Sequence, residues 1–418
     1  MSASVRIEFR ATDLGYGGRI VVHGADLEVR AGELVGLIGP NAAGKSTMLR
    51  AVTGAARVVS GEILLDGVTL ERLRPVERAR LVGVVPQSVP ALPAFSAAEF
   101  VGLGRHPHLG RLEHPSAADE MIVERSMELT DTARLADQRV DTLSGGDVQR
   151  LTLAQALAQE PGVLLLDEPT SHLDLNHRLQ VLDLVRDRAD EGLAVLGVFH
   201  DLDLAARYSD RIAVVYDGRI VDEGPPAAVL TSGLLRDVFA VRAVVGTDPV
   251  TGSVSVTPVL RTGQPPAASR GDVFVLGGSG SSASLIRRLV LAGYTVRAGA
   301  LNRGDVDQAV AEALGVEHVI LAPFDEIDAH AEELVREQVR RSQACVVSDV
   351  PFGRANIGNL RAIVGGGCPI VLVGEVSEQR DYCGGEALRM LEALRSSGAA
   401  SAGTDQDVLA WLAEPGRV

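Results

Sequence analysis

The chain has 418 residues, of which 46% are hydrophobic and 23% charged, which is typical of a globular protein, and this length predicts two domains rather than one. Its net charge of −15 leaves no basic face for a phosphate backbone, so we expect no nucleic-acid partner. The first residues, MSASVRIEFR, contain no apolar leader, and no apolar run reaches the roughly 18 residues that a membrane span needs.

A glycine-rich loop early in the chain separates an apolar run from an amphipathic stretch. The run GELVGLIG predicts a buried strand, and KSTMLRAVTG predicts a helix that ends at Gly54. The spacing Gly39-x-x-x-x-Gly44-Lys45-Ser46 between them is that of a P-loop, whose backbone N–H groups surround phosphate oxygens at a helix N-terminus. The predicted nucleotide-binding residues of this loop are Gly39, Pro40, Asn41, Ala42, Ala43, Gly44, Lys45, Ser46 and Thr47.

Lys45 is the only lysine among the 40 lysine and arginine residues. In a P-loop its compact ammonium reaches the β- and γ-phosphates, where a planar guanidinium does not fit, and the Ser46 hydroxyl binds Mg²⁺. A glycine-rich turn can also simply close a strand, but a randomly placed lysine would fall on this basic position in only about 1 of 40 cases. The loop therefore predicts a site for ATP with Mg²⁺.

Two further motifs follow in order. Ser144-Gly145-Gly146 precedes a stretch with apolar residues at helical spacing, although such a turn alone is often only a helix cap. PGVLLLDEPT is a continuous apolar run, typical of a parallel sheet covered on both faces, and it ends in two carboxylates. Taken alone it could equally be a core strand, but beside a P-loop we interpret Asp167 as a Mg²⁺ ligand and Glu168 as the general base for the attacking water.

The order of these motifs, a P-loop, then LSGG, then LLLDEPTSHLD, resembles the ATP-binding cassette (ABC) ATPases. The resemblance implies further site residues, one position at a time. Tyr16 would stack on adenine, Gln87 would sense Mg²⁺ and the attacking water and face a membrane partner, and His200 would contact the γ-phosphate. The SHLD sequence resembles the loop that acts across a dimer, and its Asp174 joins the predicted nucleotide-binding set.

The resemblance covers about residues 5–258 and implies a head-to-tail homodimer, with each ATP between Lys45 of one chain and Ser144 of the other. The N–H groups of LSGG need a γ-phosphate that their own P-loop does not present. Two positions depart from the family pattern. Ala42 replaces a usual glycine and is acceptable if it keeps φ below zero. Asp147 stands where Gln or Glu is usual, so we expect contacts of that longer side chain to be lost.

The segment GRHPHLG, with LAQEP and VVGTDPVTGSVSVTP, resembles the ATPases of importers for ferric siderophores, haem and cobalamin. We therefore predict an ATP-hydrolysing subunit that powers uptake of a metal chelate, with cobalamin or another corrinoid ahead of ferric siderophore and haem. The resemblance implies permease subunits, a substrate-binding protein and a place on the cytoplasmic face of the cell membrane. The alternatives are a soluble non-transport ABC ATPase, usually with two cassettes or a coiled-coil insertion, and a regulatory nucleotide-binding module, which should lack Glu168 or His200.

A Pro- and Gly-rich segment, RTGQPPAASR at residues 261–270, predicts a linker. It divides a cassette domain, 1–260, from a second domain, 271–400, which is followed by a tail, 401–418. The second domain alternates strand and helix segments, which predicts a doubly wound parallel sheet. The fold class is therefore α/β, with a mixed-sheet cassette and helical subdomain followed by a smaller parallel domain.

In the second domain, polar residues gather where the strands should end, which often marks a site. They are Asn302, Asp305, Asp307, Asn356 and Asn359. GGSGSS nearby is a weak relative of the dinucleotide fingerprint, and tight strand-to-helix turns use the same residues. The domain resembles the C-terminal extension of some cobalamin-type importer ATPases; one hypothesis is that it senses a corrinoid or nucleotide, the other that it is a dimerisation scaffold. Three scattered cysteines predict reduced, cytosolic thiols: Cys345, Cys368 and Cys383.

Overall fold

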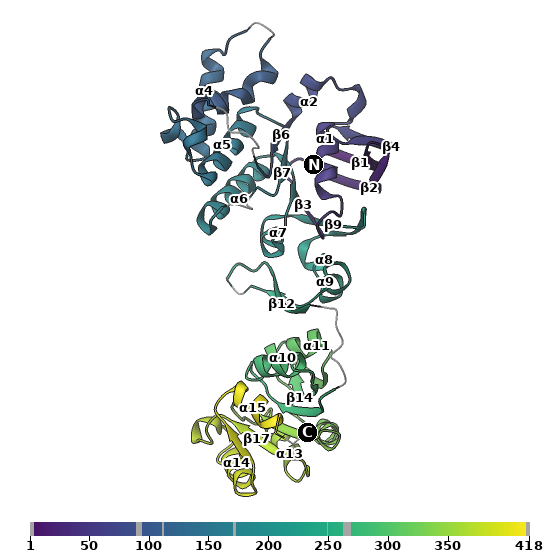
Figure 1. Cartoon of the computed structure of the whole chain (residues 1–418), viewed down its shortest axis with the longest axis vertical. Helices are drawn as coiled ribbons and strands as arrows, with labels where there is room; N and C mark the ends of the chain where they lie inside the picture. Colours follow the sequence, from purple (N-terminus) through teal and green to yellow (C-terminus); the bar gives the residue numbers. More distant parts are fainter. Residues whose placement is uncertain are drawn as a thin grey trace. The chain divides into compact units, whose positions relative to one another are not determined.

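The computed structural model describes residues 4–88, 94–110, 113–169, 173–248, 250–261 and 269–414 (Figure 1). It divides into two compact units. Unit 1 contains residues Met1–Leu234 and Val245–Val256, and unit 2 contains Leu235–Val244 and Thr257–Val418. Within the described ranges, no helix is long and apolar enough to cross a membrane. Most of the predicted linker, residues 262–268, lies outside the described residues.

Unit 1 begins with an antiparallel sheet in the order β2–β1–β4–β5. Its strands are β1 (Val5–Tyr16), β2 (Arg19–Arg30), β4 (Arg57–Leu65) and β5 (Val68–Thr69). A tight turn through Gly17 and Gly18, both at positive φ, joins β1 to β2 and places Tyr16 opposite Arg19. Tyr16 and Arg19 therefore lie side by side at the end of this hairpin.

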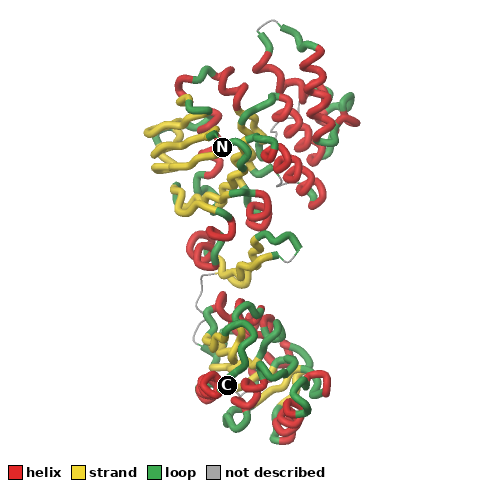
Figure 2. Tube along the Cα trace, turned by 180° about the vertical axis from the view of Figure 1, so that it is seen from behind, coloured by secondary structure: helices red, strands yellow, loops and turns green. Residues whose placement is uncertain are grey.

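A six-stranded sheet in the order β10–β9–β3–β8–β7–β6 forms the centre of unit 1 (Figure 2). Its strands are β3 (Leu34–Ile38), β6 (Val82–Val85), β7 (Val163–Asp167), β8 (Ala194–Val198), β9 (Arg211–Tyr216) and β10 (Arg219–Gly224). Neighbouring strands are parallel, apart from the antiparallel pair β9–β10. Every residue of β3 is buried, as its apolar run predicts. Because parallel strands end at the same edge, the loops after β3, β6, β7 and β8 meet there.

The helices of unit 1 flank this sheet or form a separate helical part. The α-helices are α1 (Lys45–Thr53), α2 (Pro75–Leu81), α3 (Ala97–Gly102), α4 (Ala117–Leu129), α5 (Gly145–Ala158), α6 (Leu175–Asp190), α7 (Leu202–Tyr208) and α8 (Pro226–Val229). The next helix, α9 (Ser232–Phe239), begins in unit 1 and lies mostly in unit 2. Short 3₁₀ helices are η1 (Leu70–Arg72), η2 (Leu103–His108), η3 (Ala133–Leu135) and η4 (Val140–Thr142). Helix α1 ends at Gly54 in a left-handed cap, as its sequence predicts.

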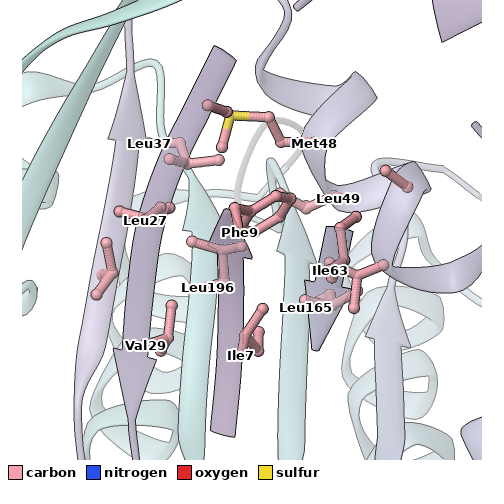
Figure 3. Packing of buried hydrophobic residues seen from close by; sticks show 14 of the residues in the cluster. Ile7, Phe9, Leu27, Val29, Leu37, Met48, Leu49, Ile63, Leu165 and Leu196 are labelled. Carbon is pink, nitrogen blue, oxygen red and sulfur yellow. The ribbon is translucent and has the colours of Figure 1, made fainter. Parts of the chain in front are cut away.

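The main core of unit 1 lies between the two sheets and α1 (Figure 3). Phe9 of the antiparallel sheet, Met48 of α1 and Leu196 of the central sheet are at most 2% exposed. Burial of such side chains, at about 25 cal/mol per Å² of apolar surface, is the main force that holds α1 against the end of β3. The core therefore supports the loop between β3 and α1.

Unit 2 contains a six-stranded sheet in the order β15–β14–β13–β16–β17–β18, parallel throughout. Its strands are β13 (Asp272–Leu276), β14 (Thr295–Asn302), β15 (Glu317–Leu321), β16 (Ala344–Val347), β17 (Ile370–Val373) and β18 (Ala400–Ala402). Its helices are α10 (Ala283–Leu291), α11 (Val306–Leu314), α12 (Ala329–Arg340), α13 (Ile357–Ile363), η5 (Glu378–Arg380), α14 (Glu386–Ser396) and α15 (Asp405–Leu412). A separate buried apolar cluster covers each face of the sheet. This doubly wound sheet confirms the predicted fold class.

The ends of the second domain differ from the sequence-based boundaries. The predicted tail, 401–418, contains part of β18 and the whole of α15, whose Val408 is fully buried, while its last residues, 415–418, lie outside the described part. A three-residue strand and an eight-residue helix are too short to give a clear periodic pattern. At the other end, β11 (Val241–Thr247) and β12 (Val254–Arg261) form a hairpin that contributes residues to both units. Val259, for example, packs in the same cluster as Val273 of β13.

The cysteines of unit 2 are closer in space than in sequence. The sulfur atoms of Cys345, in β16, and Cys368, just before β17, lie 2.9 Å apart because these two strands are neighbours. Both thiols are free, as is that of Cys383.

Candidate functional site

The P-loop, residues 39–47, connects β3 to α1 and is shaped by its glycines. Gly39 has a φ of 146°, and a Cβ atom there would sit 2.0 Å from the carbonyl oxygen of Val215 in the neighbouring β9, so no larger residue fits. Gly44, at φ 112°, is the residue before α1, and no side chain caps this described helix start. The first N–H groups of α1 are therefore available to an anion.

Ala42, inside this loop, has a φ of 64°. Alanine was expected to be acceptable here with a negative φ, so that expectation is wrong. The loop bends at this position in the way that a glycine allows, so the alanine stores strain of about 1–2 kcal/mol. Alanine in place of the usual glycine therefore introduces backbone strain into the P-loop.

Lys45 is 5% exposed, and its ammonium donates to the carbonyl oxygens of Gly39 and Pro40 at 2.7 and 2.9 Å. Burial lowers the pKa of Lys45, while the carboxylates of Glu168 and Asp167 oppose that change. A buried ammonium at the base of a loop with free N–H groups fits the phosphates of a nucleotide.

Ser46, the next residue, joins the P-loop to the end of β7. Its hydroxyl donates to the Asp167 carboxylate at 2.9 Å, across 121 positions of sequence. A hydroxyl oxygen and a carboxylate oxygen side by side are hard oxygen ligands of the kind that Mg²⁺ prefers. The arrangement fits a magnesium ion next to the phosphates.

Glu168 is the point where three loops meet. Its carboxylate accepts a hydrogen bond of 2.6 Å from the Gln87 side-chain amide, and its other oxygen contacts Nε2 of His200. Glu168 also has a φ of 53°, a strained conformation for a residue other than glycine. These contacts orient a carboxylate that can accept a proton, and such strain is common at functional sites.

Lys45, Ser46 and Glu168 line one cavity of about 550 Å³, whereas Asp167 and Gly39 are not in its described lining. Its lining is Arg19, Val21, Asn41, Ala42, Ala43, Gly44, Lys45, Ser46, Thr47, Gln87, Glu168 and His200. The structure therefore brings together the P-loop and three of the predicted catalytic and metal-binding residues from separate loops. Its charged and polar groups can hold a nucleotide and position a water molecule.

Other predicted site residues lie elsewhere. Tyr16 is 39% exposed at the end of β1 and does not line the cavity within the described residues. Ser144 begins α5, and Asp174 begins α6, where its carboxylate accepts from the His177 N–H at 2.9 Å. Gly145 and Gly146 form the first turn of α5. Ser171 and His172 of the SHLD sequence lie outside the described residues.

Two lining residues, Arg19 and Val21, were not predicted from the sequence. Arg19 pairs with Tyr16 across the turn between β1 and β2. In a tight antiparallel hairpin, the residue opposite a candidate binding residue shares its edge of the sheet. The Tyr16-Gly17-Gly18-Arg19 sequence was therefore the signal that could have identified Arg19.

The GRHPHLG segment, which carries the importer resemblance, has a structural role within unit 1. The guanidinium of Arg105, only 6% exposed, donates to Asp119 of α4, to the carbonyl of Ala158 and to Glu160 at 2.8–2.9 Å. Gly104 lies against the end of α5, so a Cβ atom there would be 2.2 Å from a backbone oxygen. This segment therefore joins η2 to α4 and α5.

In unit 2, the GGSGSS loop after β13 is held by two carboxylates at the start of α11, those of the cap residue Asp305 and of Asp307 in the first turn. Asp307, which is fully buried, accepts from the N–H groups of Gly278 and Ser282 at 2.7 and 3.1 Å, and Asp305 accepts from that of Ser279 at 2.7 Å. Burial raises the pKa of Asp307, and these hydrogen bonds oppose the rise. The amides that a phosphate would need are thus bound by the chain's own carboxylates.

The asparagines at this edge also have internal partners. Asn302 donates to the carbonyl of Ala322, Asn356 bonds within its own loop, and the buried Asn359 pairs with both backbone groups of Ala300 at 2.9 Å. All five polar residues that suggested a ligand site in the sequence therefore hold loops in place. A ligand site at this edge of the sheet therefore stays a prediction.

Comparisons with known proteins agree with the geometry of unit 1. Residues 22–171 match the ABC transporter family, and residues 296–409 match the MJ0874 family. The Cobalamin import ATP-binding protein BtuD of Halobacterium salinarum is 39% identical over 404 residues, which cover 96% of this chain and 99% of that protein.

Two other relatives cover less of the chain. The Hemin import ATP-binding protein HmuV of Nocardia farcinica is 44% identical over 243 residues, 58% of this chain and 83% of its own. The Ferric enterobactin transport ATP-binding protein FepC of Escherichia coli is 36% identical over 264 residues, 63% of this chain and 97% of its own.

Solved structures share the fold of this region. The metal-chelate type ABC transporter in an inward-facing conformation has a TM-score of 0.53 at 23% identity and covers 61% of this chain and 97% of that one. CbiO1 of Clostridium perfringens, part of the transporter complex cbiONQ, has a TM-score of 0.50 at 26% identity and covers 54% and 90%.

Proposed function

This chain belongs to the family of ABC transporter ATP-binding proteins, and we propose that it powers the import of a corrinoid such as cobalamin. We choose cobalamin because of the share of this chain that each relative matches. The relative that matches over 96% of this chain is a cobalamin import protein, whereas the hemin and ferric enterobactin relatives leave more than a third of the chain unmatched. Haem and ferric siderophores are the rival solutes.

The residues of the cavity divide the work of ATP hydrolysis. The P-loop N–H groups and Lys45 bind phosphate oxygens. Ser46 and Asp167 would hold a magnesium ion, which would supply positive charge beside the phosphates. Glu168 accepts the proton of the attacking water. Gln87 and His200 orient the Glu168 carboxylate, with which both are in contact.

The position of LSGG supports a homodimer. Ser144 begins α5 on the exposed surface and is absent from the described lining of the P-loop cavity of its own chain. The N-terminus of α5 attracts an anion, and a second copy of the chain presents one in its own P-loop. ATP bound between two copies then closes the dimer, and its hydrolysis opens it, which moves attached permease subunits.

The partners follow from this role. Permease subunits and a substrate-binding protein complete the importer, and the ATPase is associated with the membrane through the permease. We propose that it lies on the cytoplasmic face of the cell membrane, where ATP is supplied.

The experiment is reconstitution of the protein in liposomes with the permease and binding protein encoded beside its gene. We expect cobalamin-loaded binding protein to stimulate ATP turnover and radiolabelled cobalamin to enter the liposomes. The comparison arms use haem and a ferric siderophore. Stimulation by one of these alone would identify a rival solute, and ATP hydrolysis that no permease alters would contradict a role in import.

A further inference from the structure

The cap of α5 differs from other caps in the described chain. In α3, α4 and α15, a carboxylate three residues into the helix accepts the backbone N–H of the cap residue, as Asp119 does from Ser116 at 2.9 Å. In α5, Asp147 accepts from the Ser144 hydroxyl at 2.6 Å, as Asp119 does from the Ser116 hydroxyl, but the structure records no bond from the Ser144 backbone N–H to Asp147. At the start of α5, this carboxylate oxygen therefore bonds the Ser144 hydroxyl and not the Ser144 backbone N–H.

The other oxygen of Asp147 is fixed by arginines. Arg150, which is 4% exposed, donates to it at 2.7 Å, and Arg134 lies 3.4 Å away. Arg150 is itself held by the carboxylate of Asp131 at 3.1 Å. Asp147 is thus a partly buried, charge-compensated side chain that cannot easily turn away from Ser144.

This arrangement creates a competition for one proton. A serine hydroxyl has a single hydrogen to donate. Ser144 gives it to Asp147 in a short bond to a charged acceptor, which is about twice as strong as a neutral one. A phosphate oxygen that approaches Ser144 needs the same hydrogen and also meets the negative charge of Asp147.

We propose that Asp147 is a positioning residue that withholds the Ser144 hydroxyl proton and so weakens the ATP-bound closed dimer. The inference rests on the proposed function, in which Ser144 faces a nucleotide held by the second copy. The short side chain of Asp147 places one oxygen on the Ser144 hydroxyl and the other on Arg150, and the longer side chain of a glutamine or glutamate would place these atoms differently. The consequence is a dimer that closes only at higher ATP concentration and reopens readily.

The test is Asp147→Asn, which keeps the shape of the side chain. Arg150 can only donate, so the new amide must turn its oxygen toward Arg150 and its NH₂ group toward Ser144. The Ser144 hydroxyl then accepts from that group and donates outward. We expect the KM for ATP and the dissociation constant of the dimer, measured by analytical ultracentrifugation with a non-hydrolysable ATP analogue, to fall roughly tenfold, the value of one hydrogen bond to a charged group. We expect kcat to change little.

Matched variants separate this effect from helix capping. Asp119→Asn alters the similar cap of α4, where Arg105 also holds the second carboxylate oxygen, and it should leave the KM for ATP unchanged. In a Ser144→Ala background, Asp147→Asn should no longer lower the KM. If Asp147→Asn fails to fold, Asp147→Ala, which also removes the acceptor, should change the KM in the same direction.

An unchanged KM in both Asp147 variants would overturn the proposal, as would an effect that persists in Ser144→Ala. Failure of the proposed function has a different result. In that case the wild-type protein itself would show no nucleotide-dependent dimer before any substitution is made.

Discussion

The position of the Glu168 side chain is fixed by contacts that its neighbours in sequence do not predict. It combines a φ of 53° with contacts from Gln87 and His200, which belong to different loops. A side chain fixed in this way loses little conformational entropy when a water molecule binds beside it. Its removal should therefore affect catalysis more than nucleotide binding.

We predict that Glu168→Gln lowers the ATP turnover number by about 10²–10⁴, because the amide keeps the shape but cannot accept a proton. Size-exclusion chromatography with ATP should show a trapped dimer. A Glu168→Gln protein that stays monomeric with ATP, or turns over at the wild-type rate, would contradict the assigned role.

Ala42 offers a stability test at the same loop. We predict that Ala42→Gly raises the free energy of unfolding by about 1 kcal/mol, because glycine adopts a φ of 64° without steric strain. Urea unfolding monitored by circular dichroism measures the change. Ala43→Gly is the matched control, since Ala43 is buried and is not among the positive-φ residues, and it should destabilise. A loss of stability in Ala42→Gly would show that the alanine is not strained.

Lys45 tests whether shape or charge matters in the loop. The ammonium lies between two carbonyl oxygens at 2.7 and 2.9 Å and is almost fully buried. We predict that Lys45→Arg reduces ATP turnover nearly as much as Lys45→Ala, because the wider guanidinium does not fit this position. Turnover close to wild type in the arginine variant would show that charge alone is sufficient.

At the scale of elements, the helical part of unit 1 depends on the ion pairs of Arg105. This buried side chain joins η2 to α4 and to the end of α5. The GRHPHLG motif, which suggests an importer, therefore also stabilises the position of α5, the helix that begins with LSGG. An unpaired carboxylate near the core is far more costly than a broken surface pair.

We predict that Arg105→Ala lowers the free energy of unfolding several times more than Arg74→Ala. Arg74 pairs with Glu77 in a single exposed contact, with an exposed fraction of 78% for the arginine side chain. Thermal unfolding by calorimetry compares the two variants under the same conditions. Similar melting temperatures would mean that the Arg105 network contributes little to the helical part.

At the scale of the whole molecule, the two units contribute differently. The groups of the ATP cavity lie between Arg19 and His200, all in unit 1, whereas the relative that matches nearly the full chain also includes the region of unit 2. The GGSGSS loop of unit 2 is filled by Asp305 and Asp307. Two predictions for unit 2, that it senses a corrinoid or nucleotide or that it is a dimerisation scaffold, therefore need tests separate from those of catalysis.

We predict that a chain that ends at Arg261 still binds and hydrolyses ATP, because among the described residues none beyond His200 lines the cavity. It should unfold at a lower temperature, because Val259 loses the apolar cluster that it shares with Val273. ATP turnover and calorimetry measure these effects. Loss of turnover in a truncated chain that remains folded would show that unit 2 takes part in the catalytic dimer.

The sequence by itself determined the fold class and the P-loop, because both depend on patterns of neighbouring residues. The apolar runs of β3 and β7 and the spacing of Gly39, Gly44 and Lys45 are properties of neighbouring residues, so they can be read without knowledge of the rest of the chain. The two-domain order is visible for the same reason. Short elements such as α15 could not be recognised, because eight residues carry too little periodicity.

Only the tertiary structure decided how distant residues meet. The contacts of Glu168 with Gln87 and His200, the positive φ of Ala42 and the addition of Arg19 to the cavity depend on where parallel strands end and how the loops turn between them. The same is true of Asp305 and Asp307, which occupy a loop that the sequence presents as a ligand site. A side chain's partner is set by its position in space, and contacts between residues far apart in sequence fix that position.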